Sequence, residues 1–427
     1  MKRKTKMKDH GCSIKRPLLT MPPFIRGHGG LISISFLMAL FSGFGQSVFF
    51  GAYIPQIQES LGLTKTTIGS LYTMATLVSA VIIIYTGKML DHLPLQRFVT
   101  FVLCGLAMGC FVLSNAQNTA MIFLAFLLLR QCGQGLMGLT ATTTINRYMT
   151  TGRGKAMALI QLGHPANMIA FPFLAFFIAR YMEWHSAWFI YGLFVLFVLL
   201  PGFWFYLRTH QETRHAKWEA QEKANNENPA TALGKIWTRT HVLQDWRFYS
   251  LMALTVIPPF TGTAIFFYQG ELATSLALTP LMFASSFPFF TITSAICSFL
   301  TGAVIDKHGE KSSLIVYPLC TVIGLLFLTN GHNIALVYAG MTFLGASFGI
   351  IATISAPLLA RIYGTKHLGA IKSLFFSSSI VSSAIPPVLF GFLMDYGYDI
   401  KLLLSWVVYY TAATWFLTFR ICDKKYE

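Results

Sequence analysis

One positive charge stands alone within the apolar stretches of this sequence. Of the 32 Lys and Arg residues and the 16 Asp and Glu residues, only Arg130 lies deep inside such a stretch. It stands about ten residues, or about 15 Å of helix, from the start of the apolar run near 120–146. A charged side chain near the middle of a bilayer costs about 2.5–3.5 kcal/mol on insertion scales, so its presence indicates a function.

Arg130 needs a partner, and no acidic residue lies at comparable depth in the sequence. Three partners are open to it: backbone carbonyls, water in a cavity, or an anionic substrate. A guanidinium is planar and binds a carboxylate through two parallel hydrogen bonds. We therefore expect Arg130 to face a substrate, with a structural role in pairing helices as the alternative.

Other polar side chains within the apolar stretches are expected to complete a cavity. The predicted substrate-binding residues, besides Arg130, are Gln46, Tyr53, Gln134, Gln161, Asn167, Tyr268 and Gln269. Each could instead form a hydrogen bond between helices, as such residues commonly do in membranes. His164 is the histidine that lies well inside an apolar stretch, so it is the candidate for a coupling proton. A histidine hydrogen-bonded within the packed interior is the alternative.

The composition indicates that these residues are carried by membrane-spanning helices. The chain has 54% hydrophobic and 11% charged residues, whereas charged residues make up about 25% of a soluble domain. A spanning helix needs about 20 apolar residues. Twelve such spans lie near 29–53, 66–88, 98–116, 120–146, 154–181, 185–208, 248–272, 279–304, 312–330, 333–360, 366–392 and 399–421. The sequence therefore predicts an all-α membrane protein with twelve transmembrane helices.

The distribution of basic residues predicts the topology. The termini and alternate loops carry nearly all of the Lys and Arg residues, and the opposite side carries only Lys65, Arg180 and Lys401. Loops rich in Lys and Arg stay in the cytoplasm. We therefore expect a multi-pass protein of the cytoplasmic (inner) membrane with both termini cytoplasmic. Its predicted parts are a basic N-terminal tail (1–28), a six-helix bundle (29–208), a cytoplasmic linker (209–246), a second six-helix bundle (247–421) and a C-terminal tail (422–427).

Several function classes are disfavoured. The net charge of +16 is concentrated outside the spans and accompanies no nucleic-acid recognition motif, so no nucleic-acid partner is expected. The seven cysteines form no CxxC pair, so neither a metal site nor a disulfide framework is predicted. No HExxH, GxSxG or Walker pattern is present. We therefore expect no enzyme, no cofactor and no self-contained ATP-driven pump.

An internal repeat divides the spans into six and six. The segment GKMLDHLPLQR follows the second span and GAVIDKHGEK follows the eighth. The repeated residues are Gly87, Asp91 and Arg97 in the first copy, and Gly302, Asp306, Lys307, Gly309 and Lys311 in the second. Asp91 and Asp306 are 215 residues apart, close to half of the chain. Duplicated halves with a substrate held between them are a recurring transporter plan.

This repeated loop resembles the signature of the major facilitator superfamily, and RQCGQGLMG around Arg130 is similar to that superfamily's fourth-helix motif. The first copy departs from the signature at His92 and Pro94. The resemblance implies two pseudo-symmetric six-helix bundles and a secondary transporter that works by alternating access. It also implies that the loop residues latch one gate, with Asp91 and Asp306 near helix N-termini. A purely structural turn is the alternative.

The segments GFGQSVFFGAYIP and RIYGTKHLGAIKS resemble those of bacterial members near the oxalate–formate and monocarboxylate group. A lysine that carboxylate exchangers of this group can carry in the eleventh helix has no counterpart in SLFFSSSIVSSA, which disfavours dicarboxylates. The leading hypothesis is therefore a monomeric transporter of a small organic anion, monocarboxylate-like, coupled to protons or to counter-anion exchange. An exporter of amphiphilic drugs or siderophores is the alternative, and a transport-dead sensor or scaffold is a third.

Overall fold

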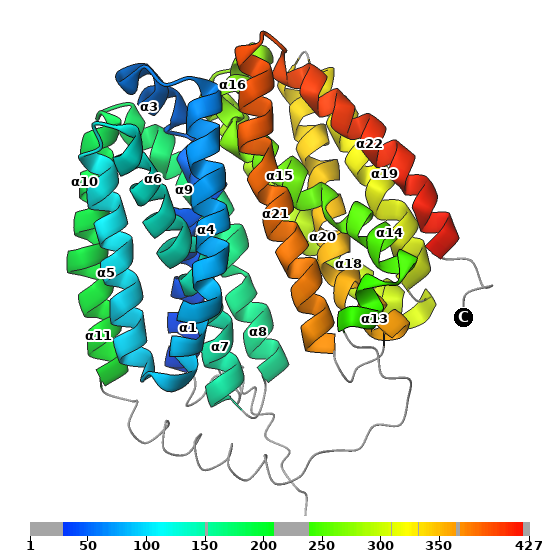
Figure 1. Cartoon of the computed structure of the whole chain (residues 1–427), viewed down its shortest axis with the longest axis horizontal. Helices are drawn as coiled ribbons and strands as arrows, with labels where there is room; N and C mark the ends of the chain where they lie inside the picture. The colour runs from blue at the N-terminus through cyan, green and yellow to red at the C-terminus, as the bar shows by residue number, and fades with distance from the viewer. Residues whose placement is uncertain are drawn as a thin grey trace, which may run out of the picture.

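The structure is a computed structural model that describes residues 29–149, 153–208, 239–308, 310–331, 333–363 and 368–421. These residues form helices joined by short turns, in two halves (Figure 1). The helices of the first half are α1 (Gly29–Phe41), η1 (Ser42–Gly45), α2 (Ser47–Gly51), α3 (Ile54–Leu61), α4 (Lys65–His92), α5 (Leu95–Ser114), α6 (Thr119–Leu128), η2 (Leu129–Met137), α7 (Gly138–Tyr148), α8 (Arg153–Gln161), α9 (Gly163–Ala179), α10 (Trp184–Phe194), η3 (Val195–Leu199) and α11 (Leu200–Arg208).

The second half has fewer interruptions. Its helices are α13 (Arg239–Leu243), α14 (Trp246–Thr255), α15 (Ile257–Phe267), α16 (Gln269–Ser275), α17 (Pro280–Ala284), α18 (Phe287–His308), α19 (Glu310–Thr329), α20 (Ile334–Tyr363), α21 (Leu368–Asp395) and α22 (Ile400–Ile421). The short helix α13 lies inside the segment predicted as a linker, and α14 begins one residue before the predicted second bundle. Both predicted tails lie outside the described residues.

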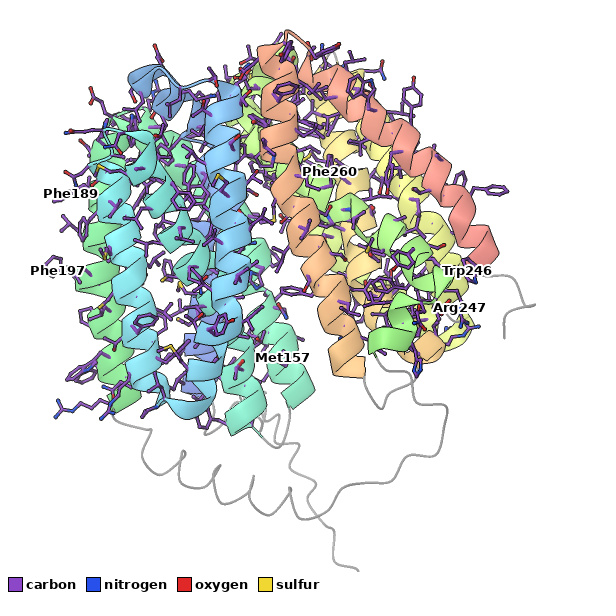
Figure 2. The ribbon with its side chains drawn as sticks, viewed as in Figure 1. Met157, Phe189, Phe197, Trp246, Arg247 and Phe260 are labelled. Atoms are coloured by element: carbon purple, nitrogen blue, oxygen red, sulfur yellow. The ribbon has the colours of Figure 1, made fainter. Side chains whose placement is uncertain are left out.

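The all-α membrane class predicted from the sequence is confirmed. Within the described residues, ten helices are long and apolar enough to cross a membrane. The first predicted span is divided among α1 and the two short helices η1 and α2, and the twelfth corresponds to α22, which has 22 residues. Large apolar side chains point outward from the bundle, as Phe189 and Phe197 do in Figure 2. The protein is therefore a multi-pass membrane protein.

Helix starts follow the local sequence. The N-cap side chains of Thr64, Asn118 and Thr279 each accept a hydrogen bond from the backbone N–H three residues further on, at the starts of α4, α6 and α17. Such caps satisfy donors that have no partner within the helix. Gly62 ends α3 with φ +61°, a left-handed conformation that costs glycine little.

The two halves meet mainly at one end of the molecule. We call this the closed end; it is where α4 begins and α21 ends. The pairs α4–α21, α2–α15 and α9–α18 make extensive contacts between the halves. Figure 1 shows α4 and α21 approaching each other at the closed end and diverging toward the opposite end, where α11 ends and α13 begins. We call that opposite end the linker end.

Candidate functional site

The first predicted span is interrupted at half its length. Residues Ser42–Gly45 form a 3₁₀ turn, and Gln46 follows in an extended conformation with φ −86° and ψ 146° before α2 begins. Glycines at 43 and 45 weaken the α-helix here, since glycine loses the most conformational freedom on folding. Irregular backbone at membrane depth occurs where it is buried in protein or lines a cavity. We call Ser42–Gln46 the α1 break.

The α1 break packs directly against a second irregular segment, the π-helical η2. A Cβ atom at Gly45 would overlap Leu129 O and Gln134 N, and one at Gly133 would lie 2.7 Å from Gly45 N. Only glycine at these two positions allows the backbones to approach so closely. π-Helical turns frequently mark functional sites. Two departures from α-helical geometry, from helices distant in sequence, therefore meet at one point.

Arg130 extends from η2 at this meeting point. Its side chain is buried, with 7% of the residue exposed, and its Nη1 lies 3.4 Å from Gly45 O. The guanidinium also lies over Tyr72, with Cζ 5.0 Å from the ring centroid. No Asp or Glu among the described residues forms an ion pair with it. An Arg over an aromatic ring gains about 0.5–2 kcal/mol, but it still lacks a counter-charge.

Tyr72 connects Arg130 to the other half of the molecule. Its ring lies 4.6 Å from the ring of Phe267 at the end of α15, and Tyr72 itself is fully buried. A single aromatic side chain therefore separates the guanidinium from the second half. Sequence reasoning missed this role, because a tyrosine in an apolar span has the same local pattern as any core aromatic.

Three further predicted residues converge on the α1 break. Gln134, one turn after Arg130, has its backbone nitrogen against Gly45. Asn167 Nδ2 donates to Ala39 O at 3.2 Å, in the turn before the break. His164 Nδ1 lies 3.5 Å from Ser42 Oγ, in the break itself. Together with Gln46 and Arg130, these residues form the candidate site.

The other predicted residues lie elsewhere. Tyr53 Oη lies 2.6 Å from Tyr191 Oη within a buried aromatic cluster of the first half, and Gln161 is exposed at the end of α8. Tyr268 donates to Pro387 O, and Gln269 Nε2 donates to Val48 O at 2.7 Å. Tyr268 and Gln269 are buried near the closed end, so their hydrogen bonds help to hold the closed end together.

A group of charged residues at the closed end was not singled out from the sequence. Asp395 accepts hydrogen bonds from Lys65 N at 3.2 Å, from Thr66 N at 2.7 Å and from Thr66 Oγ1 at 2.6 Å. Lys65 Nζ lies 3.0 Å from Glu271 Oε2. We call Lys65, Thr66, Glu271 and Asp395 the closed-end latch. The latch joins the N-terminus of α4 to the second half. At that N-terminus the helix dipole favours the carboxylate of Asp395.

The predicted gate motif is only partly described. Gly87, Arg97, Gly302 and Lys307 are described, and both Arg97 and Lys307 are exposed. Gly309 and the side chains of Asp91, Asp306 and Lys311 lie outside the described residues. The gating role of this motif therefore stays a prediction.

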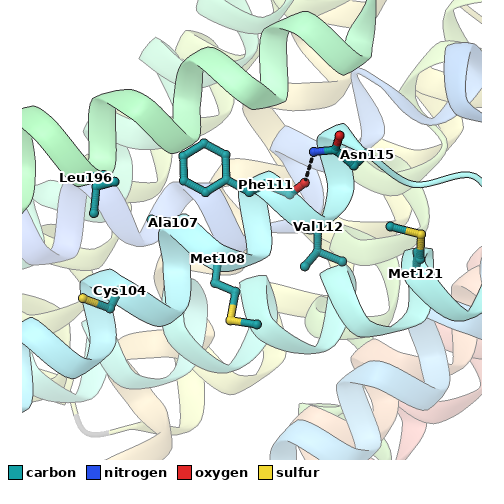
Figure 3. Close-up of a pocket in the computed structure, with 8 residues that line it drawn as sticks. All are labelled: Cys104, Ala107, Met108, Phe111, Val112, Asn115, Met121 and Leu196. Atoms are coloured by element: carbon teal, nitrogen blue, oxygen red, sulfur yellow. Dashed lines mark hydrogen bonds between the residues drawn. The ribbon is translucent and has the colours of Figure 1, made fainter.

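A groove of about 390 Å³ lies along α5 (Figure 3), and Arg130 is not among the residues that line it. Its lining residues are Cys104, Ala107, Met108, Phe111, Val112, Asn115, Met121 and Leu196. Asn115 provides the polar side chain, and its Nδ2 donates to Phe111 O at 2.9 Å. The groove opens toward the lipid, since Met108 and Cys104 are exposed, and its lining contains no charged group.

Comparisons with known proteins address the whole chain. The family model described as Major Facilitator Superfamily matches residues 35–287 and 251–421. A crystal structure of the nucleoside transporter NupG is similar with a TM-score of 0.71 and 10% identity, covering 92% of this chain and 98% of that one. A crystal structure of a point mutant of NupG gives 0.66 and 13%, covering 91% and 100%. A search of curated proteins finds no matching sequence. At such identities the structural likeness concerns the fold alone.

Proposed function

Because the chain belongs to the major facilitator superfamily, and is therefore a secondary transporter and not an enzyme, we propose that it carries a small organic anion across the cytoplasmic membrane. The proposed substrate is a monocarboxylate-like metabolite that binds Arg130. Transport would be coupled to protons or to counter-anion exchange. The observation that carries this proposal is the state of Arg130: buried at the α1 break, with no carboxylate partner among the described residues.

The alternative, a purely structural Arg130, fits the geometry less well. Its hydrogen bond to Gly45 O is 3.4 Å long, beyond the usual range of about 2.7–3.2 Å. A guanidinium has five N–H donors. The long bond to Gly45 O and the hydrogen bond with Tyr72 leave the others for another ligand. A carboxylate would supply both the missing acceptors and the missing charge.

Two other substrate classes are less well supported. Exporters of amphiphilic compounds would be expected to have a protonatable carboxylate at membrane depth, and none pairs with Arg130 among the described residues. A nucleoside, the substrate class in the name of the similar structure, is uncharged and would leave the guanidinium without a counter-charge. A nucleoside therefore serves as a comparison ligand in the test below.

The closed-end latch suggests how transport would proceed. In the predicted topology the linker end is cytoplasmic, so the closed end faces outward, and the structure represents a conformation closed to the outside. Alternating access requires the latch contacts between α4 and α21 to break as the halves rock. His164, beside Ser42 in the α1 break, is the proposed carrier of a coupling proton.

The test is ligand-induced stabilisation followed by uptake. Purified protein is heated with formate, acetate, pyruvate, lactate or uridine, since a ligand that binds only the folded state raises the apparent stability. We expect stabilisation by at least one monocarboxylate and none by uridine. Uptake of that labelled acid into proteoliposomes should fall to background in Arg130→Ala.

The matched control is Arg180→Ala, which removes one positive charge from an exposed position and should transport normally. Arg130→Lys keeps the charge but loses the planar fork, so it should retain weak uptake. Unchanged uptake in Arg130→Ala would contradict the proposal, and so would stabilisation by uridine in the absence of any effect of the acids.

A further inference from the structure

Tyr72 is in contact with both the candidate site and the second half of the molecule. The guanidinium of Arg130 lies over its ring, with Cζ 5.0 Å from the ring centroid, and donates a hydrogen bond to its hydroxyl. The ring of Tyr72 also lies 4.6 Å from the ring of Phe267, in α15 of the second half. Both aromatic residues are buried. A displacement of the guanidinium or of the second half must therefore change the surroundings of Tyr72.

The helix that carries Tyr72 is held to the second half on either side of it. One turn earlier, a Cβ atom at Gly69 would overlap a backbone carbonyl of α21, so the two backbones are in contact. The next residue, Thr73, donates its hydroxyl to Ala384 O at 2.5 Å. These contacts belong to the closed conformation and must break when the halves rock apart at the closed end. The contact between Tyr72 and Phe267 must break with them, because α15 moves with the second half.

An anion at Arg130 would compete with Tyr72 for the same guanidinium. A carboxylate forms stronger hydrogen bonds with a guanidinium than a neutral hydroxyl does. Because the attraction of a cation for an aromatic ring is electrostatic, a guanidinium paired with a carboxylate is attracted less to the ring. The closed conformation then loses an interaction that it has without the anion. A ligand shifts a conformational equilibrium by its difference in affinity for the two states, so the anion favours opening of the closed end.

We propose that Tyr72 is a positioning residue that couples anion binding at Arg130 to the closed end. It holds the guanidinium against the second half while the closed end is shut, and an anion that pairs with Arg130 releases it. This inference rests on the proposed function, since it assigns a role to a neighbour of the same site. It concerns the conformational response to a bound anion and not the identity of that anion. The coupling is reciprocal, so the interaction that opposes opening also opposes anion binding.

The experiment measures the conformation of the closed end and the anion affinity on the same variants. Spin labels at Glu59→Cys and Tyr398→Cys, in the cysteine-free full-length chain, report the distance across the closed end. The distances are measured without ligand and with formate, acetate, pyruvate or lactate in turn. With Tyr72 in place, we expect a bound acid to lower the ratio of closed to open molecules about fivefold, the lower end of typical couplings between sites. Isothermal titration gives the dissociation constant of each acid.

Three substitutions separate the two contacts of Tyr72. In Tyr72→Leu both contacts are lost, so the acid should no longer change the ratio, and its affinity should rise up to about fivefold because coupling is reciprocal. A tyrosine with a merely structural role would weaken binding when removed. In Phe267→Leu the hydrogen bond with Arg130 remains, so the response should be lost at unchanged affinity. Tyr72→Phe keeps the ring and removes only the hydroxyl; it should show the effects of Tyr72→Leu to a smaller extent without disturbing folding.

The matched control is Tyr317→Phe, which removes the hydroxyl of another buried tyrosine, one that donates to Leu254 O within the second half. Its response and affinity should equal those of the unmodified chain. A full response to the acids in both Tyr72→Leu and Phe267→Leu would overturn the inference, and so would weaker anion binding by Tyr72→Phe. Acids that bind the unmodified chain without changing the ratio would overturn the inference and leave the proposed function standing. Failure of every acid to bind would overturn the proposed function and this inference with it.

Discussion

The fourth and tenth spans occupy corresponding positions in the two halves, yet they differ in what their central residues do. In the first half, α6, η2 and α7 include a π-helical segment that carries Arg130. In the second half, α20 is one α-helix of 30 residues. The residue 215 positions after Arg130 is Gly345. A Cβ atom at Gly345 would overlap the backbone of Phe290.

The difference shows how a duplicated fold comes to hold a charge in one half only. Gly345 and Gly349 bring α20 into backbone contact with α18, at Phe290 and Ser294. Thr353, one turn further, hydrogen-bonds Ser298 at 2.7 Å. This interface is filled by backbone, so it has no room for a long side chain. In the first half the fourth span instead meets the first span at Gly133 and Gly45, and the guanidinium of Arg130 donates to Gly45 O.

The largest effect is expected from disrupting the interface between α18 and α20 in the second half. Gly345→Leu forces α20 away from α18, and overpacking of this kind costs about 3 kcal/mol or more where backbone must move. The measurement is the thermal unfolding and the yield of monodisperse protein in detergent. Gly202→Leu is the matched control, because a Cβ at Gly202 meets no atom within 4 Å. Equal stability of the two variants would show that the α18–α20 interface is not tightly packed.

Much of this architecture could be predicted from the sequence, because the features that indicate it are local. Span lengths, the 215-residue offset between Asp91 and Asp306, and the isolation of Arg130 can all be read from residue order. The family resemblance then supplied the arrangement of the helices, which the matched family model supports.

The neighbours of each side chain were harder to predict, because they depend on packing between distant segments. Tyr53 and Tyr268 are 215 residues apart and both look like cavity residues in sequence. In the structure the hydroxyl of Tyr53 pairs with Tyr191, and that of Tyr268 donates to a carbonyl of α21. The π-helical η2 and the role of Tyr72 likewise depend on the α1 break packing against the fourth span.

The second prediction concerns the counter-charge that Arg130 lacks, and it is tested by adding an acidic side chain to the same helix. In Gln134→Glu a carboxylate stands one turn from Arg130, where residues four apart on a helix interact. This side chain would take the place of the substrate's carboxylate. We expect the affinity for monocarboxylates to fall about 10- to 100-fold, the range set by hydrogen bonds to charged groups. Thermal-shift titration measures it.

Gln244→Glu adds the same charge at an exposed position and should leave that affinity unchanged. Monocarboxylates that bind Gln134→Glu as tightly as the unmodified chain would contradict the assignment of Arg130 as their counter-charge.

The third effect concerns the way in which the halves are joined. Asp395 caps the N-terminus of α4, whereas the residue 215 positions earlier is Arg180, whose sign does not suit a helix N-terminus. The contact that Asp395 makes therefore has no counterpart at the corresponding position of the first half. Asp395→Asn should shift the population away from the closed conformation by about threefold to tenfold, a modest change because exposed ionic contacts are screened.

Distances between spin labels at Glu59→Cys and Tyr398→Cys, in a cysteine-free background, report the closed end. Asp399→Asn is the matched control, since Asp399 bonds Ser275 within the second half. If Asp399→Asn opens the closed end as much as Asp395→Asn does, the contact between halves is not what holds it closed.

The smallest effect is expected from Gln131, which follows Arg130 in the π-helical segment. Gln131 Oε1 accepts from Ser79 Oγ and its Nε2 donates to Thr86 Oγ1, both at 2.8 Å, so its amide joins η2 to α4 through both of its polar atoms. Gln131→Leu should lower stability by about 0.6 kcal/mol, the average for such bonds between membrane helices, without changing anion affinity. Thermal unfolding and titration of the same sample measure both quantities. An affinity loss equal to that of Arg130→Ala would mean that Gln131 itself takes part in binding the anion.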